Sequence, residues 1–193
     1  TTDQSQVAED KIFISYRDFP KDVKTGEAIM LDDGKMNLRV TKTDGKTEVV
    51  AKVINGGLLM SHKGINLPNT KLSLPSLSEK DKHDVRFILD HKFDWIALSF
   101  VRVNADIEGL ISMMNSYSPD HSIPVIAKIE KPEAVKNIDS IIQVAHGVMV
   151  ARGDLGVEIP LQNVPMIQKM IVKKCLANAK PVIIATQMME GML

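Results

Sequence analysis

The sequence predicts an α/β fold in which a parallel sheet follows a smaller β-rich segment. Between residues 95 and 185, short runs rich in Val, Ile and Ala alternate with longer amphipathic stretches. The runs recur roughly every 25 to 35 residues, the spacing that parallel βα units require. Earlier in the chain, Asp-Gly pairs separate runs of alternating polar and apolar residues, which is the pattern of β-hairpins. Two regions of different architecture are therefore expected.

The first 66 residues are expected to form short antiparallel strands. Residues 11–16 alternate polar and apolar side chains, which favours a half-buried strand. The pairs Asp33-Gly34 and Asp44-Gly45 lie between alternating runs, and primed hairpin turns need the positive φ that such pairs tolerate. The patterns account for only about four or five strands, so we expect a partial small β-barrel or sandwich.

The second region begins after a stretch of little periodicity with two prolines, residues 61–78. Ser78 followed by Asp81 resembles the capping box that starts a helix. From there the apolar patterns predict strands at 95–100, 125–129, 148–151 and 182–185, and helices at 106–116, 132–145 (one or two short ones) and 162–178.

The alternation of strands and helices favours a barrel over a doubly wound fold. The chain has no Gly-x-Gly-x-x-Gly after a first strand and no phosphate loop with Gly-Lys-Ser. Polar groups follow several successive strands, as they do in (β/α) barrels. We therefore predict a partial (β/α)8 TIM barrel of about four βα units over residues 71–193, preceded by the partial β-rich domain over residues 1–70.

Composition excludes several classes of partner. The 193 residues carry 24 basic and 24 acidic side chains, so no long-range field attracts nucleic acid or an anionic membrane. No apolar stretch approaches the roughly 20 residues that span a bilayer, and the first residues do not resemble a signal peptide. Cys175 is the single cysteine, which excludes an intrachain disulfide. A reducing compartment, the cytoplasm, is expected.

Charged side chains gather where the predicted strands end. Lys128 and Glu130 lie two residues apart on one strand, so both project to the same face. A plain salt bridge explains this pair as well as a functional site does. Asp154 follows the next strand, however, and two carboxylates from neighbouring strand ends make an oxygen site suited to Mg²⁺ or Mn²⁺.

Further groups at these strand ends suit an anionic substrate. Lys128 places positive charge where negative charge can develop on a phosphoryl group or an enolate. The N–H groups near Gly153 and Asp154 can hold a carboxylate, and Thr186 adds a hydroxyl that both donates and accepts. Together these groups suit a small acid that bears phosphate.

Three weaker candidates lie near the same edge. Ser99 and Arg102 follow the strand at 95–100, where Arg102 either pins a loop or touches a ligand. Arg152 either forms a structural ion pair or lies near the site.

Several runs of the sequence resemble the signatures of the pyruvate kinase family. The runs are AKIE at 127–130, MVARGDLGVE at 149–158, PVIIATQMM at 181–189, KGINLP at 63–68, LP at 74–75 with SEKD at 78–81, and ALSFVR at 97–102. They occur in the family's order and at its approximate spacing, from about residue 26 to the end of the chain.

The resemblance implies transfer of phosphate from phosphoenolpyruvate to ADP, giving pyruvate and ATP, with Mg²⁺ and K⁺ required. Lys128 matches the lysine that stabilises the phosphoryl and enolate charge, and Thr186 matches a catalytic threonine near the enolate methylene. Glu130 and Asp154 match the ligands of the divalent ion. Gly153, with Asp154, matches the backbone that holds the substrate carboxylate.

The resemblance also implies a lid domain, of which this chain holds a part, and further parts of the enzyme that this sequence lacks. Lys63 matches a nucleotide-contacting lysine of a lid domain inserted after the third barrel strand. The chain is expected to begin inside that lid and to end after the seventh strand, without the K⁺ ligands of the first strands. We therefore expect a piece of a homotetrameric enzyme that turns over little by itself.

Two alternatives stay open. In one, the chain is a non-catalytic scaffold whose open barrel edges pair with another copy. In the other, it is a metal-dependent lyase or aldolase of the phosphoenolpyruvate/pyruvate barrel type. The lid-like β-region and Lys63 argue against the second alternative, because such lyases need no nucleotide lid.

Overall fold

The computed structural model of the chain describes residues 1–8, 10–73, 75, 77–119 and 122–185. The chain divides into two compact units, Thr1–Leu74 and Pro75–Leu193. Within the described residues, no helix is both long enough and apolar enough to cross a lipid bilayer.

The first unit is built on one antiparallel sheet in the order β3-β2-β1-β4. Its elements are η1 (Gln4–Gln6), α1 (Phe19–Asp22), β1 (Ala28–Leu31), β2 (Met36–Thr43), β3 (Val49–Asn55) and β4 (Ile65–Asn66). The last strand lies within residues 61–78, the stretch of little periodicity, and it pairs with β1 through Leu31 and Ile65.

Both predicted hairpins are confirmed. The turn between β1 and β2 places Asp32, Asp33 and Gly34 at positive φ, as a primed turn requires. Between β2 and β3, one carboxylate oxygen of Asp44 accepts the main-chain N–H groups of residues 46, 47 and 48 at 2.8–3.0 Å. These bonds lower the pKa of Asp44 to about 2. Local turn chemistry thus sets the register of the sheet.

The strand predicted at 11–16 is wrong. Of this stretch only Lys11 forms a bridge, with Ala8. The chain instead pairs with its own first residue: the Thr1 ammonium donates to the Ile12 carbonyl at 2.8 Å, and the Ile14 N–H donates to the Thr1 carbonyl. A strand needs a neighbouring strand for its hydrogen bonds, which an alternating pattern alone does not supply.

The second unit is built on a parallel sheet in the order β5-β6-β7-β8. Its elements are α2 (Glu79–Asp90), β5 (Ile96–Leu98), α3 (Asn104–Tyr117), β6 (Val125–Ile129), α4 (Pro132–Lys136), α5 (Ile138–Val144), β7 (Gly147–Ala151), α6 (Arg152–Glu158), η2 (Leu161–Asn163), α7 (Val164–Ala177) and β8 (Val182–Ala185). The predicted α/β alternation and the parallel pairing are confirmed.

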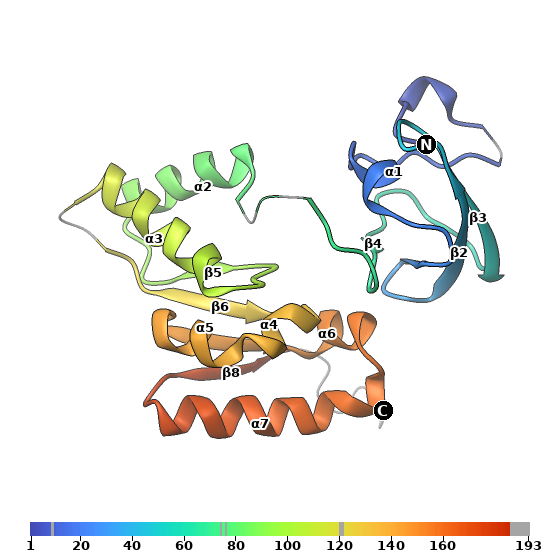
Figure 1. Ribbon diagram of the computed structural model, residues 1–193. Coiled ribbons are helices and arrows are strands. Elements are labelled where there is room, and N and C mark those ends of the chain that lie inside the picture. Colours follow the sequence, from blue (N-terminus) through green and yellow to red (C-terminus); the bar gives the residue numbers. More distant parts are fainter. Residues whose placement is uncertain (9, 74, 76, 120–121, 186–193) are drawn as a thin grey trace. The chain divides into compact units, whose positions relative to one another are not determined.

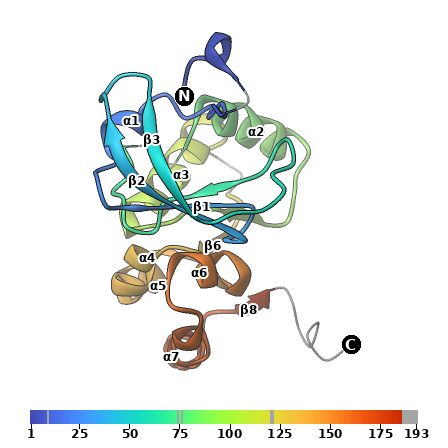
Figure 2. The same cartoon turned by 90° about the vertical axis from the view of Figure 1, so that its right-hand side faces the viewer.

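Each strand of this sheet pairs with the strand that precedes it in the chain, so every connection crosses over in the same sense. Helices α4, α5 and α7 lie on the same face of the sheet (Figures 1 and 2). The registers Leu98↔Ala127 and Ile129↔Val150 bring the carboxyl ends of β5, β6 and β7 to one edge. The residues that follow these strands therefore emerge side by side.

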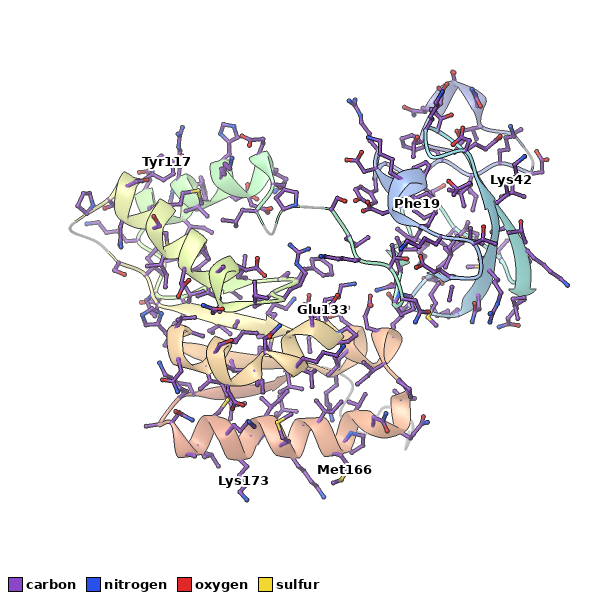
Figure 3. The ribbon with its side chains drawn as sticks, in the orientation of Figure 1. Phe19, Lys42, Tyr117, Glu133, Met166 and Lys173 are labelled. Carbon is purple, nitrogen blue, oxygen red and sulfur yellow. The ribbon has the colours of Figure 1, made fainter. Side chains whose placement is uncertain are left out.

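The core of the second unit lies between this sheet and its helices. Alternate residues of β6, namely Val125, Ala127 and Ile129, are fully buried. Helix α7 contributes the buried residues Ile171 and Cys175 to the same core, in agreement with the predicted inner face. Its opposite face carries Met166 and Lys173, which point away from the sheet (Figure 3). The amphipathic pattern thus places α7 correctly.

Helix α6 is an element that the sequence did not predict. It begins directly after β7, and its seven residues include two glycines and an aspartate, all poor helix formers. Leu155 anchors it, because this side chain is fully buried in the core. A Cβ at Gly156 would come within 2.8 Å of Leu161 Cδ1, so the helix packs closely on the following turn. Tertiary packing here overrides intrinsic propensity.

Candidate active site at the carboxyl ends of the parallel strands

Lys128 and Glu130 form the centre of the candidate site. They lie on the face of β6 opposite the buried residues Ala127 and Ile129, as the alternation of a strand requires. Lys128 Nζ lies 2.5 Å from Glu130 Oε1. The Glu130 side chain is 2% exposed and that of Lys128 is 25% exposed. Because an unpaired buried carboxylate is very costly, this ion pair is what allows Glu130 to be charged at the strand end.

The loop after β5 adds two further contacts to the pair. Lys128 Nζ donates to Ser99 Oγ at 3.0 Å. The main-chain N–H of Phe100 donates to Glu130 Oε2 at 2.9 Å. Both carboxylate oxygens of Glu130 are therefore engaged, one by an ammonium and one by a peptide group.

Phe100 has an unusual backbone, with a φ of +56°. This conformation costs a residue with a Cβ roughly 1–2 kcal/mol. A hydrogen bond to a charged acceptor contributes about 1.5–3 kcal/mol, so the Glu130 carboxylate can offset the strain. The end of β5 is thus shaped by the carboxylate at the end of β6, a coupling that neither stretch of sequence reveals by itself.

Asp154 and Gly153 lie in the first turn of α6, directly after β7. Since Ile129 is in register with Val150, this turn follows the strand next to the one that carries Glu130. Asp154 is exposed, in contrast to the buried Glu130. One buried and one accessible carboxylate thus leave adjacent strands at the same edge of the sheet.

A second ion pair lies beside the first. Lys131 Nζ is 2.5 Å from Glu158 Oε1, and both residues are buried. Lys131 Nζ also lies 5.6 Å from the centroid of the Phe100 ring. Sequence reasoning missed both residues, although Lys131 adjoins Glu130 and Glu158 ends the run that contains Asp154. The missing information was the helical turn of α6, which brings residue 158 back towards β6.

Two of the three weaker candidates, Arg152 and Arg102, form hydrogen bonds that stabilise the segments after the strands. Arg152 Nε donates to the carbonyl of Ala185 at 3.2 Å and so links the end of β7 to the end of β8. The main-chain N–H of Arg102 donates to Asp106 Oδ2 at 2.8 Å, which starts α3. Ser99, in contrast, contacts Lys128 directly and belongs to the site.

Two further predicted site residues are Thr186 and Lys63. Thr186 lies outside the described residues. Lys63 belongs to the first unit, where its Nζ lies 3.0 Å from Asp32 Oδ1. Asp32 also pairs with Lys35 at 3.1 Å, and its pKa is lowered mainly by its hydrogen bonds with these two lysines. The β1–β2 turn therefore orients Lys63 within the first unit.

The donor set of the second unit suits a hard divalent cation. No group of three or more His, Cys, Asp or Glu side chains that could hold a metal occurs in the described part of the chain. Mg²⁺ is commonly held by only one or two carboxylates together with waters and phosphate oxygens of a substrate. Glu130 retains lone pairs beyond its two hydrogen bonds, because a carboxylate offers about four acceptor positions. Glu130 and Asp154 fit such an ion.

Comparison with known proteins shows the family of the chain. The family described as "Pyruvate kinase, barrel domain" matches residues 1–193. Pyruvate kinase of Clostridium acetobutylicum is 49% identical over 95% of this chain and 38% of its own length. The Corynebacterium glutamicum enzyme is 44% identical over 100% and 40%, and that of Geobacillus stearothermophilus is 46% identical over 95% and 31%. The chain thus spans about two fifths or less of these curated relatives. It belongs to the pyruvate kinase family.

Proposed function

We propose that this chain contributes the phosphoenolpyruvate and metal site of a pyruvate kinase, which transfers phosphate from phosphoenolpyruvate to ADP and yields pyruvate and ATP. The observation that carries this proposal is the cluster of Lys128, Glu130 and Ser99 at the ends of β5 and β6, next to the turn with Asp154. A site of this kind works by positioning and electrostatic stabilisation.

Glu130 and Asp154 would hold Mg²⁺ or Mn²⁺. The bound ion would orient the substrate and neutralise charge on its phosphate. The buried Glu130 is already fixed by two hydrogen-bonding partners, whereas Asp154 is exposed and accessible to a ligand. The family also requires K⁺, and we assign no residue of this chain to that ion.

Lys128 would neutralise charge on the phosphoryl group and on the enolate. Its side chain is a quarter exposed, and its ammonium has two partners, Glu130 and Ser99. A ligand that approaches from the open side can thus draw on its third N–H. Main-chain N–H groups of Gly153 and Asp154 would bind the substrate carboxylate, and Thr186 would lie near the enolate carbon. Lys63 would contact the nucleotide.

Fold and domain organisation support the same proposal. Four parallel strands in sequential order are what about four units of a (β/α)8 barrel require, and the antiparallel first unit suits a lid domain. Residues 1–193 would therefore hold part of a lid and about half of a barrel. The full enzyme would be a cytoplasmic homotetramer. By itself the chain would turn over slowly, since catalysis needs both halves of the site.

An assay of ATP formation from phosphoenolpyruvate and ADP tests this proposal in the full-length gene product. Replacement of Lys128 by Ala should lower kcat by roughly 10²–10³, the cost of losing one electrostatic stabiliser. The matched control is Lys136→Ala, because Lys136 is an exposed lysine of α4 in the same region. Absence of Mg²⁺-dependent ATP formation by the unaltered protein would contradict the proposal.

A second candidate function rests on the edges of the sheet. Among the described residues, β5 and β8 each pair on one side only. Trp95, just before β5, is 44% exposed, and Ile183, within β8, is 40% exposed. Such edges can pair with another copy of the chain. Light scattering tests this scaffold function on residues 1–193, and a strict monomer would contradict it.

A further inference from the structure

The buried ion pair between Lys131 and Glu158 has no task in the reaction proposed above, yet it joins the two segments that carry Glu130 and Asp154. Its side chains are 10% and 2% exposed, and the two charged atoms lie 2.5 Å apart. Lys131 is the N-cap residue of α4, two residues after the end of β6, and Glu158 is the last residue of α6. The pair thus joins the end of one strand to the helix that follows the next strand.

A carboxylate at the position of Glu158 is unfavourable without a cation. The carboxyl end of a helix carries partial negative charge from its free carbonyl groups, which repels a nearby anion. Burial adds a desolvation penalty of several kcal/mol. The Lys131 ammonium compensates both effects. Loss of Lys131 would therefore drive the end of α6 away from β6, towards water.

The residue spacing connects this pair to the metal carboxylates. Glu158 lies four residues after Asp154, so both side chains lie on the same face of α6, one turn apart. Lys131 is the immediate neighbour of Glu130. A shift at the Lys131–Glu158 contact would therefore change the separation of Glu130 and Asp154.

Phe100 extends the coupling to a third strand end. The Lys131 ammonium lies 5.6 Å from the centre of the Phe100 ring, within the range of a cation–π contact. The N–H of the same residue donates to Glu130. Lys131 thus contacts Phe100, which follows β5, on one side of β6 and Glu158, in the helix after β7, on the other.

We propose that Lys131 and Glu158 are positioning residues, which set the distance between Glu130 and Asp154 and thereby the affinity for the divalent ion and for phosphoenolpyruvate. This proposal rests on the function proposed above. Neither residue is assigned a contact with the substrate.

The test compares Lys131→Met and Glu158→Gln in the full-length gene product. Binding of Mn²⁺ is measured by electron paramagnetic resonance with phosphoenolpyruvate present, and KM is measured for each substrate. Each variant should bind Mn²⁺ about tenfold more weakly, as is typical when a residue that orients metal ligands is lost. The KM for phosphoenolpyruvate should rise, whereas the KM for ADP should stay within about twofold of the unaltered value.

Two further variants separate positioning from stability alone. Lys131→Arg keeps the charge and should restore most of the Mn²⁺ affinity. Lys174→Met removes the lysine of another ion pair between elements, Lys174–Asp139, which joins α7 to α5. This control should leave Mn²⁺ affinity unchanged. If Lys131→Met does not fold, the Mn²⁺ affinity of the nearly isosteric Glu158→Gln variant tests the proposal.

Unchanged Mn²⁺ affinity in Lys131→Met and Glu158→Gln, with only a lower melting temperature, would overturn the proposal and leave the proposed function intact. Failure of the unaltered protein to bind Mn²⁺ with phosphoenolpyruvate would instead contradict the proposed function, and this inference with it.

Discussion

Tyr16 in the first unit shows how burial and a contact with one carboxylate together raise a pKa. Its hydroxyl donates to the carboxylate of Asp22, which also accepts from the N–H and the hydroxyl of Ser73 at 2.7 and 2.6 Å. Partial burial, together with the hydrogen bond and the negative charge of Asp22, raises the pKa of Tyr16 from 10.0 to about 12. The neutral phenol is therefore favoured in the folded state.

The sign of this shift fixes its effect on stability. Because the folded-state pKa lies above the unfolded value, the contribution is fully present below pH 10 and is lost as the pH rises towards 12. In a Tyr117→Phe variant, which leaves Tyr16 as the single tyrosine, we predict tyrosinate formation near pH 12. Replacement of Asp22 by Asn should lower that midpoint towards 10.

Ultraviolet absorbance, recorded with circular dichroism, checks this prediction on the folded chain. Ionisation of Tyr16 near its ordinary pKa while the chain is still folded would show that the Asp22 contact is absent in solution.

The candidate site shows which of its contacts can be predicted from the spacing of residues in the sequence. The two-residue spacing of Lys128 and Glu130 placed both on one face of a strand, and the structure brings them into contact. Their partners Ser99 and Phe100 lie about thirty residues away in sequence. Contact with Phe100 needs a positive φ, which is uncommon for a residue with a Cβ and leaves no pattern in the sequence. Local periodicity could predict the pair but not what surrounds it.

At the scale of elements, α2 begins with the capping box that the sequence predicted. The Asp81 N–H donates to Ser78 Oγ at 3.2 Å, and the Ser78 N–H donates to Asp81 Oδ2 at 2.7 Å. We predict that Ser78→Ala lowers the free energy of unfolding by about 1 kcal/mol, because an N–H group of the first turn loses its acceptor.

Urea unfolding of the full chain, with Ser78→Thr as the conservative control, measures this effect. A loss in Ser78→Ala no larger than that in the control would mean that solvent satisfies the helix end equally well.

Helix α6 and residues 11–16, in contrast to α2, were not predicted correctly from local sequence patterns. The cap of α2 is local, so a four-residue pattern was enough to predict it. Helix α6 depends on the burial of Leu155, and the failed strand depended on a pairing partner, both of which are tertiary properties. Elements that tertiary contacts decide are those that sequence patterns miss.

At the scale of the whole molecule, the two units have separate cores. Phe19 is 2% exposed within the first core (Figure 3), and Ile171 is fully buried in the second. Calorimetry should resolve two transitions. Phe19→Ala should lower the temperature of one transition, because the free energy of unfolding of the first unit falls by about 3–5 kcal/mol. Ile171→Ala should lower the temperature of the other transition, with a loss of about 2–5 kcal/mol in the second unit.

A single transition that both substitutions shift equally would contradict this independence.

The sequence predicted the second unit well, because the βα alternation has only a few topological solutions and sequential parallel pairing is the simplest. Contacts such as Lys131–Glu158, which connect neighbouring units of that alternation, required the structure.

The central claim is that Glu130 holds the divalent ion on which phosphoenolpyruvate binding depends. The most direct measurement is Mn²⁺ binding by electron paramagnetic resonance with phosphoenolpyruvate present, for Glu130→Gln and for the control Glu133→Gln on α4 (Figure 3). The Gln side chain at position 130 can still accept the Phe100 N–H, so the fold should persist. We predict a loss of at least about tenfold in Mn²⁺ affinity for Glu130→Gln and none for the control. Equal Mn²⁺ affinity in both variants would contradict the claim.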